Sequence, residues 1–446
     1  MSRYTYSPLL PGPDSIRLLR LIPHKDEAAP IQCRLMNYTL QASIRKPCPY
    51  EALSYVWGDT NESLSISIDN FHFSVTINLF AALSRLRDRD FERIIWVDAI
   101  CINQTDDKEK ESQIQFMAKI YSQASNVIVW LGEAAENSDR ALEDIRVAAA
   151  YKLTNSLFHK NSERSILRLL ERPWFHRIWV LQEVAAARHV LMICGSAEID
   201  GHAFCLGLDA LKRMYEARPD FEGMIRSVIY LIRGAIFRPR HWAHGVGRSS
   251  LHISSLGELI DMYHAHKATK RHDKLYALIG MCSDDLSEGG LLPNYELPWE
   301  ELFQRLVKFI IHQGVWVKTW GDGAMALIKS KACILGKVSI SMDSAREEGV
   351  AMDITFNHLP EQTKYTKEWT TRWNLHTSAK SIKNGDVICL LQGASKPTIV
   401  RLYEDYCAII VIAVTLPEDT RIDNKWQDLA QSNDLFIRDL LLVWDW

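Results

Sequence analysis

Along the first half of the chain, short apolar runs alternate with segments in which apolar residues recur every three or four positions. The apolar runs predict strands, which we place at residues 16–23, 31–40, 50–59, 64–68, 71–77, 94–104, 126–132 and 189–194. Asp69-Asn70 separates two of these runs and predicts a hairpin turn. The helical period begins after Asn78, which we expect to cap the first helix, again after Asp106, and over residues 138–151.

Strands and helices alternate from residue 50 to residue 195, and the strands there are continuously apolar. Strands of this kind are typical of a parallel sheet that helices bury on both faces. We therefore expect an α/β fold with a parallel sheet flanked by helices. In such folds ligands bind beyond the carboxyl ends of the strands, so polar residues at strand ends are candidate site residues.

The second half of the chain has a weaker pattern. Helices are predicted over residues 256–263 and 299–314, and the chain becomes rich in strands after residue 331. We expect a second, mixed α+β domain there. The predicted division has three parts: residues 1–47 with N-terminal strands that pack on the next domain, residues 48–200 with the α/β domain, and residues 201–446 with the mixed C-terminal region.

One predicted helix carries two polar residues in the middle of an apolar stretch. It begins at Pro173, which suits the first helical position because the N–H that proline lacks would have no partner there. Glu183, preceded by Gln182, lies one turn after Trp179 and two turns after His176. Glu183 lies either in an ordinary structural position, paired with Arg177 or Arg188, or on the floor of a pocket.

Polar and aromatic residues close three of the predicted strands and could share one crevice with Glu183. They are Trp57, Gly58, Asp59, Asp98, Asn103 and the segment Trp130-Leu131-Gly132. Each polar residue also has a local alternative: Asp59 as the cap of its loop, Asp98 as the anchor of a backbone turn, and Asn103 as the start of the next helix. The pattern leaves both interpretations open.

Composition narrows the classes of function. The net charge is −3, so no excess of basic residues indicates a nucleic acid or an anionic membrane as the partner. The nine cysteines are scattered without paired spacing, and the longest apolar run, residues 406–416, is too short to span a bilayer. The N-terminus lacks the pattern of a secretory signal. We therefore expect a reduced, soluble, cytoplasmic protein.

Few residues have the spacing of a known catalytic or metal-binding motif. Cys101 lies in an apolar run without a neighbouring histidine, which favours a buried structural thiol over a nucleophile. His264, His266, His272 and Asp273 do not follow a zinc-binding spacing, so no metal is expected. Walker A, G-x-G-x-x-G, G-x-S-x-G and H-E-x-x-H motifs are absent, which removes the commonest nucleotide-binding, esterase and metalloprotease classes.

Three blocks of sequence within residues 50–195 resemble one known family. They are YEALSYVWGD, IWVDAICINQTDDKEKESQIQFMAKIYSQASNVIVWLG and RPWFHRIWVLQE. In their order, spacing and residue identities they resemble the signature blocks of the fungal heterokaryon incompatibility (HET) domain. Two later segments, HDKLYALIGM and GDVICLLQG, resemble segments that commonly follow this domain. The resemblance implies a role in non-self recognition between fungal cells and in programmed cell death, a fungal counterpart of innate immunity.

The HET domain is in turn considered similar in fold to Toll/interleukin-1 receptor (TIR) domains, which implies a flavodoxin-like parallel sheet. Several TIR domains hydrolyse NAD⁺ with one glutamate on a helix. RIWVLQEV resembles the stretch that carries this glutamate, with Val180 where TIR enzymes often have cysteine. The resemblance implies that Glu183 is catalytic. The residues expected around the substrate are Trp57, Gly58, Asp59, Asp98, Asn103 and Trp179.

On this interpretation NAD is a substrate, and no cofactor is expected. Cleavage of the nicotinamide–ribose bond passes through an oxocarbenium-like state, which one carboxylate can stabilise while indole rings stack on the flat groups. TIR-type enzymes often need two subunits, which implies self-association through the HET domain. The alternative is a non-enzymatic interaction module that triggers death through an unknown protein partner.

Overall fold

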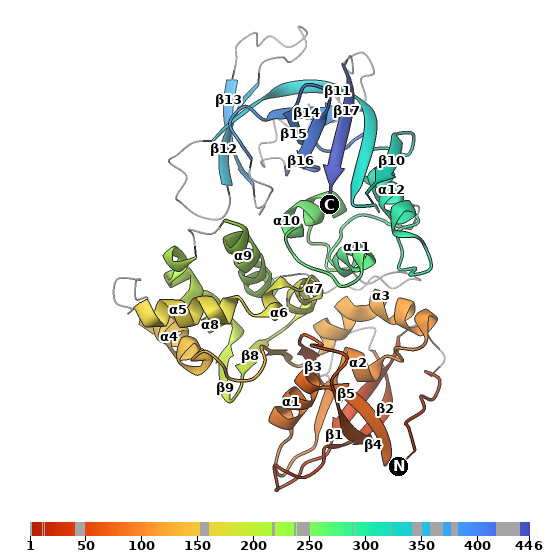
Figure 1. The fold of residues 1–446 in the computed structure, drawn as a ribbon, viewed down its shortest axis with the longest axis vertical. Coiled ribbons are helices and arrows are strands. Elements are labelled where there is room, and N and C mark those ends of the chain that lie inside the picture. The colour runs from red at the N-terminus through yellow and green to blue at the C-terminus, as the bar shows by residue number, and fades with distance from the viewer. Residues whose placement is uncertain are drawn as a thin grey trace. The chain divides into compact units, whose positions relative to one another are not determined.

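The structure is a computed structural model that describes residues 2–10, 12, 14–40, 50–151, 160–215, 219–235, 238, 250–287, 289–321, 323–340, 350–356, 369–375, 382–415 and 438–446. They form two compact units (Figure 1). The first unit comprises Met1–Ile253 and His266–Met281, and the second comprises Ser254–Ala265 and Cys282–Trp446. Residue 200, where we place the end of the α/β domain, falls inside the first unit.

A mixed sheet with the strand order β5-β4-β2-β1-β6-β3-β7-β8-β9 is the framework of the first unit. Its strands are β1 (Ser15–Leu21), β2 (Gln32–Thr39), β3 (Glu51–Ser54), β4 (Ser63–Ile68), β5 (Phe71–Thr76), β6 (Arg93–Trp96), β7 (Val127–Trp130), β8 (Val190–Cys194) and β9 (Ala197–Asp200). A strand is found in each predicted position of this half of the chain, but two are shorter than predicted: β3 ends at Ser54, and β6 ends at Trp96, before the helical residues 98–101 that we predict as part of a strand over residues 94–104. The pattern does not predict β9, which is short.

Parallel pairing is found in the centre of this sheet. There β3 pairs with both β6 and β7, and β7 pairs with β8, all in parallel. All residues of β7 are buried, as expected for a strand covered on both faces. The N-terminal strands β1 and β2 join the same sheet, because β1 pairs antiparallel with β6 and with β2. The parallel sheet is thus confirmed for the central strands, within a sheet that is mixed overall.

The hairpin predicted around Asp69-Asn70 is confirmed. Ile68 lies opposite Phe71, so Asp69 and Asn70 form a two-residue turn between β4 and β5. Their φ angles are 51° and 67°, values that asparagine and aspartate tolerate better than most residues.

The next helix begins differently from the prediction. Helices in the first unit include α1 (Ile77–Leu86), α2 (Asp98–Cys101), α3 (Asp107–Gln123), α4 (Ser138–Tyr151), α5 (Lys160–Leu170), α8 (Gly201–Ala210), α9 (Pro219–Gly234) and α11 (Arg271–Ile279). The N-cap of α1 is Thr76, whose hydroxyl accepts a hydrogen bond from Leu79 N. The prediction of Asn78 is wrong because its amide instead bridges Val56 O, at 2.6 Å, and Trp130 Nε1, at 2.9 Å.

The helix predicted from Pro173 is divided into two. Pro173 begins α6 (Pro173–His176) as expected, and α7 (Trp179–Ala186) follows after a break. Arg177 has extended φ and ψ angles of −78° and 129° at the break. The break is stabilised by Lys267, whose N–H donates to His176 O at 2.6 Å and whose carbonyl accepts from Ile178 N at 2.9 Å.

The second unit contains two helices and a second sheet among its described residues. The elements are α10 (Leu256–Tyr263), α12 (Trp299–Ile310), β10 (Trp316–Trp320), β11 (Met325–Ile340), β12 (Val350–Phe356), β13 (Trp369–Leu375), β14 (Val387–Leu391), β15 (Thr398–Leu402), β16 (Cys407–Val411) and β17 (Arg438–Asp445). They confirm the predicted helices and the strand-rich C-terminal part. Helix α12 ends at Ile310, before the predicted residue 314.

The long strand β11 closes part of this sheet into a ring. β11 pairs with β17 along its first half and with β14 along its second half, while β14, β15, β16 and β17 pair in that order. Aromatic side chains join helix α12 to β17: Trp299 stacks on Phe303 at 5.6 Å, and Phe303 lies 5.4 Å from Trp444.

Two further findings concern membrane spans and cysteines. No helix in the described part of the chain is both long and apolar enough to cross a membrane. Among the described cysteines, all have free thiols, and Cys333 is the least buried.

Candidate functional site

The candidate site is a group of polar side chains at the carboxyl end of β3. Ser54 is the last residue of β3, Asp98 begins α2 after β6, Arg177 lies in the break between α6 and α7, and Glu183 lies in α7. We call Ser54, Asp98, Arg177 and Glu183 the Glu183 cluster. It joins three of the segments that the sequence analysis singles out.

Glu183 lies at the end of a short chain of hydrogen bonds. Its side chain is almost completely buried, with 1% of the residue exposed. Ser54 donates its hydroxyl proton to Glu183 Oε2, and Trp174 Nε1 donates to Ser54 Oγ at 2.9 Å. The buried indole therefore orients the serine hydroxyl, which in turn orients the carboxylate.

Arg177 supplies the positive charge of the cluster. Its Nη1 lies 3.8 Å from Glu183 Oε1, and its Nη2 lies 3.6 Å from Asp98 Oδ2. Its shortest contact is with the backbone, because Nη1 donates to Tyr55 O at 2.5 Å. Burial lowers the pKa of Arg177, but the charges of Glu183 and Asp98 outweigh burial, so the pKa is raised. Arg177 thus stays charged between two carboxylates.

The pKa of Glu183 is raised to about 7. Burial is the main cause, because the charged carboxylate loses its contact with water. Arg177 and the hydrogen bond from Ser54 lower the pKa, and the charge of Asp98 raises it. A carboxyl group with a pKa near neutrality can both take up and release a proton at physiological pH, as general acid–base catalysis requires.

Asp98 anchors its own backbone turn and also contacts residues of other segments. Its Oδ1 accepts from Ala99 N at 2.7 Å, which anchors the first turn of α2. Its Oδ2 accepts from Trp57 Nε1 at 2.8 Å and faces Arg177. Asp98 therefore connects the end of β6 with the end of β3.

Two buried tyrosines lie beside the cluster. Tyr121 donates to Leu53 O at 3.0 Å. Tyr55 is 1% exposed, and its hydroxyl has no hydrogen-bond partner of normal geometry in the described part of the chain. Burial raises the pKa of Tyr55 first of all, and the charge of Asp98 raises it further. A side-chain hydrogen bond with Asp98 also contributes to the raised pKa, so the Tyr55 hydroxyl lies beside the Asp98 carboxylate.

The structure brings only some of the predicted residues together. Trp57, Asp98 and Glu183 meet through the contacts given above, with Gly58 next to Trp57 at a φ of 80°. Asp59 is exposed and accepts two hydrogen bonds from Asn61, which is its local alternative as a loop cap.

Trp179 is 8% exposed and begins α7, one turn before Glu183. Gln182, next to Glu183 in the sequence, has a packing role. Its side-chain amide donates to Ala277 O at 2.9 Å and accepts from Ala118 N at 2.8 Å, in the orientation that satisfies both atoms. Gln182 therefore ties α7 to α3 and α11 and does not face the cluster.

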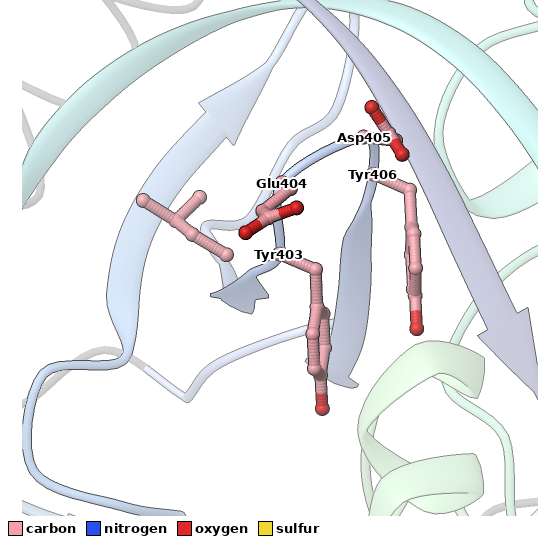
Figure 2. Close-up of a pocket in the computed structure, with 5 residues that line it drawn as sticks. Tyr403, Glu404, Asp405 and Tyr406 are labelled. Atoms are coloured by element: carbon pink, nitrogen blue, oxygen red, sulfur yellow. The ribbon is translucent and has the colours of Figure 1, made fainter.

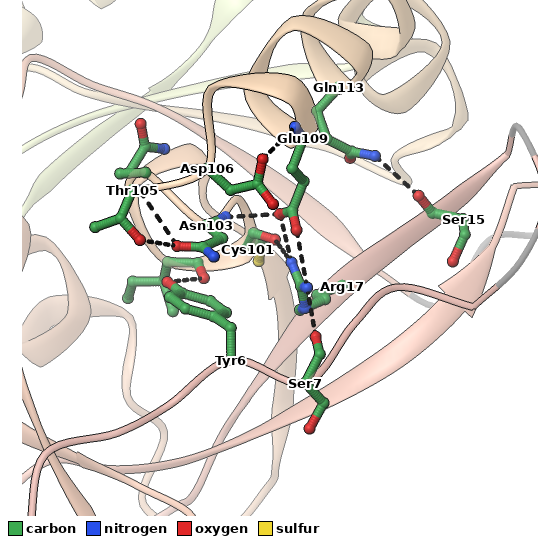
Figure 3. A network of polar contacts seen from close by, with 12 residues as sticks. Tyr6, Ser7, Ser15, Arg17, Cys101, Asn103, Thr105, Asp106, Glu109 and Gln113 are labelled. Atoms are coloured by element: carbon green, nitrogen blue, oxygen red, sulfur yellow. Dashed lines mark hydrogen bonds and ion pairs between the residues drawn. The ribbon is translucent and has the colours of Figure 1, made fainter.

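Asn103 belongs to a separate network around Arg17 (Figure 3). Its side chain accepts from Thr105 N and Oγ1, as expected of a residue that starts a turn before a helix. Its N–H donates to Glu109 Oε1, and Glu109 is held by Arg17 through contacts of 2.6 Å and 3.0 Å. Arg17 also donates to Cys101 O. Asn103 is therefore part of a structural network that holds the end of α2.

Cys101 is buried, as we expect of a structural thiol, and burial raises its pKa to about 12. A thiol with so high a pKa is not a nucleophile at neutral pH. Among the described residues, no three His, Cys, Asp or Glu side chains are close enough together to hold a metal ion.

Sequence reasoning misses Ser54, Tyr55 and Trp174 as site residues and names Arg177 only as an ion-pair partner. A signal exists for Ser54, because it is a polar residue between the apolar residues Leu53 and Tyr55, as Glu183 lies between polar and apolar residues of an apolar helix. No signal identifies Trp174, which looks like an ordinary core residue. The ion pair between Glu183 and Arg177 is confirmed, whereas Arg188 donates to Ser122 O instead.

Comparison with known proteins gives two matches and one negative result. A family model described as heterokaryon incompatibility protein (HET) matches residues 50–183. A curated protein of Neurospora crassa, heterokaryon incompatibility protein 6, OR allele, is 28% identical over 346 residues, which cover 63% of this chain and 49% of that protein. The chain therefore spans about half the length of this curated relative. No solved structure matches.

Proposed function

We propose that this chain, which carries a heterokaryon incompatibility (HET) domain at residues 50–183, acts in fungal non-self recognition and in the cell death that follows it. The printed name of the N. crassa relative supports this role. The family match begins at Tyr50, just before β3, and ends at Glu183. It therefore includes every member of the Glu183 cluster.

We further propose that the Glu183 cluster cleaves NAD⁺ between nicotinamide and ribose. The observation that carries this proposal is the buried Glu183 carboxyl, with its pKa near 7, at the end of a central parallel strand. In open α/β sheets, ligands bind beyond the carboxyl ends of the strands, at the point where the strand order reverses.

The strand order supports a TIR-like, flavodoxin-like fold for this domain. The central parallel strands follow one another in the chain as β3, β6, β7 and β8, and they lie in the sheet as β6-β3-β7-β8. The order is therefore second, first, third and fourth, as in flavodoxin-like sheets. β3 lies where this order reverses, and its last residue, Ser54, donates to Glu183.

The proposed reaction needs one carboxylate and one water molecule. The bond between ribose C1′ and the nicotinamide nitrogen breaks, and its electron pair leaves with neutral nicotinamide. The ionised Glu183 stabilises the positive charge that develops on the ribose. Water then adds to C1′ and loses a proton, which gives ADP-ribose. Because Glu183 is 1% exposed, the residues that cover it have to move before the ribose can reach the carboxylate.

The test is nicotinamide release from NAD⁺ by the purified full chain, dilute and artificially clustered, because TIR-type activity often depends on assembly. We expect release by the wild type and none by Glu183→Gln. Asp98→Asn and Asp59→Asn form a matched pair, because the first changes a cluster member and the second an exposed loop residue. We expect a loss with Asp98→Asn and wild-type release with Asp59→Asn. No release by the clustered wild type would overturn the enzymatic proposal.

The burial of Glu183 also favours a second candidate function, a non-enzymatic interaction module. In that case Glu183 is a structural residue, paired with Arg177 and hydrogen-bonded by Ser54, and death is triggered through a partner protein. Cell killing separates the two candidates. The module keeps killing when Glu183→Gln is folded and loses it when exposed charges are reversed, whereas the enzyme loses killing with Glu183→Gln.

A further inference from the structure

A hairpin tip in the second unit exposes a pair of stacked tyrosines. β15 and β16 are antiparallel, with Leu402 opposite Cys407, and Tyr403 N donates to Tyr406 O at 2.9 Å. Glu404 and Asp405 are therefore the two residues of the turn. We call Leu402, Tyr403, Glu404, Asp405 and Tyr406 the hairpin tip; these residues form an open surface feature.

The rings of Tyr403 and Tyr406 are stacked on each other. We call this stacked pair the tyrosine plate. Their centroids are 4.8 Å apart, with an angle of 13° between the planes, and Figure 2 shows both rings pointing the same way from the tip. Tyr403 is 49% exposed, Tyr406 is 39% exposed, and Leu402 beside them is 51% exposed. Adjacent large apolar side chains that remain this exposed are typical of a surface that contacts another molecule.

One of the other aromatic stacks in the same unit is buried by comparison. Trp299 stacks on Phe303 with 16° between the planes, and these residues are 7% and 0% exposed. That stack helps to fix α12 within the core of the unit. The tyrosine plate does not fill a core in this way, so packing alone does not account for two aromatic rings at a turn.

The hairpin tip is negatively charged. Glu404 and Asp405 are both exposed, and no lysine or arginine is among the residues of the tip. The preceding Arg401 forms a two-point ion pair with Asp386, at 2.8 Å and 2.9 Å, and a further side-chain hydrogen bond with Tyr403. Asp386 is 2% exposed, so this pair is an internal one. The tip thus combines two carboxylates with an aromatic face.

We propose that the hairpin tip is a docking surface for an arginine-bearing segment of a protein partner. A guanidinium is planar and stacks on tyrosine faces, and it forms two-point hydrogen bonds with carboxylates. The ammonium group of lysine has the same charge as a guanidinium, but it is not planar and cannot form the two parallel hydrogen bonds. We therefore expect this surface to prefer arginine over lysine. Tyrosine and arginine are also enriched among the residues that dominate binding energy at interfaces. This surface is independent of the Glu183 cluster and adds a partner site in the second unit.

The test is the binding of a dye-labelled peptide of arginines spaced by glycine and serine to the full chain, followed by fluorescence anisotropy. Peptides with lysine or glutamate in place of arginine are compared with it. We expect the arginine peptide to bind best, the glutamate peptide not to bind, and binding to weaken as salt is raised. Tyr403→Ala with Tyr406→Ala, and Glu404→Gln with Asp405→Asn, should each weaken binding by about tenfold or more.

Two control variants separate this surface from general electrostatic attraction. Phe91→Ala removes an aromatic side chain that is 75% exposed in the first unit, and Glu62→Gln removes an exposed carboxylate there. Both should bind the arginine peptide as the wild type does. The proposal is overturned if the glutamate peptide binds as well as the arginine peptide, or if the hairpin-tip variants bind like the controls. Equal binding of the lysine and arginine peptides, unaffected by the tyrosine variants, would overturn the stacking role of the plate.

Discussion

Arg177 Nη1 lies 3.8 Å from Glu183 Oε1, and the glutamate side chain is 1% exposed while the arginine side chain is 21% exposed. The distance exceeds the roughly 2.7–2.9 Å typical of charge-assisted hydrogen bonds. Arg177 therefore acts on Glu183 chiefly through its charge, while its shortest hydrogen bond goes to Tyr55 O. This arrangement leaves Glu183 able to change its protonation state near neutral pH.

The first prediction concerns stability against pH. The folded-state pKa of Glu183, about 7, is raised above the ordinary value of 4.5. The protonated form is therefore favoured by folding, and its contribution to stability is present below pH 4.5 and is lost as the pH rises through 7. The loss amounts to about 3 kcal/mol in the free energy of unfolding. Denaturant unfolding at a series of pH values from 5 to 8 measures it.

Glu183→Gln is the control for this prediction. Glutamine has no charge to bury, so the variant should lack this fall in the free energy of unfolding, with the remaining pH dependence unchanged. If the variant lost as much stability over this range as the wild type does, the pH dependence would come from other groups.

The second prediction concerns Ser54. Ser54→Ala removes the hydroxyl that lowers the pKa of Glu183, so this pKa should rise further. It also leaves Trp174 Nε1 without its acceptor, and an unpaired buried donor costs about 1–3 kcal/mol. Unfolding measurements should show lower stability together with a shift of the pH midpoint to higher pH. Ser122→Ala is the matched control, because Ser122 is buried but its hydroxyl bonds within its own helix; an equal pH shift there would contradict the assignment.

The pattern of apolar and polar residues predicts most helices and strands of the first unit, because each of them is specified by residues close together in the sequence. The apolar runs of β3 and β7 and the Asp69-Asn70 turn need no distant contact to be recognised. Where a residue has two suitable partners, the pattern is insufficient. Asn78 is a good N-cap residue, but its side-chain amide is hydrogen-bonded to Trp130 and to Val56 O. Thr76 is the N-cap of α1 instead.

The site is harder to predict than the fold, because distant contacts determine its geometry. Arg177 leaves the helical conformation where Lys267, far along the chain, pairs with the backbone on both sides of it. No periodicity within residues 173–186 contains this information. The polar interruption of the helix draws attention to Glu183, which the structure places in a buried polar group. Its neighbour Gln182 has a packing role that the same pattern cannot separate from it.

The third prediction concerns the charge balance of the cluster. Arg177→Gln leaves the Glu183 and Asp98 carboxylates buried without a cation, so the pKa of Glu183 should rise and the free energy of unfolding should fall by about 3–5 kcal/mol. The loss should be smaller when Glu183→Gln is already present, because one of the buried charges is then gone. A double-mutant cycle at pH 8 measures this coupling. Additive losses would mean that Arg177 does not interact with Glu183.

The last prediction compares two arginines on the same strand. Arg17 is 3% exposed and is bound by Glu109, Cys101 O and Ser7 O, whereas Arg20 pairs with Glu92 at the surface, where the two side chains are 35% and 46% exposed. Removing one partner of a buried ion pair leaves an unpaired buried charge, while water and salt screen an exposed pair. Arg17→Gln should therefore lower the free energy of unfolding by about 3–5 kcal/mol, and Arg20→Gln by less than about 1 kcal/mol.

Denaturant unfolding of the two variants at one pH checks this comparison. Glu109→Gln tests the same pair from its other side and should be destabilising as well, because Arg17 then stays buried without its anion. Equal, small losses for Arg17→Gln and Arg20→Gln would show that the network in Figure 3 does not hold α2 against β1. A large loss confined to Arg17→Gln and Glu109→Gln would instead show that the N-terminal strands are an integral part of the first unit.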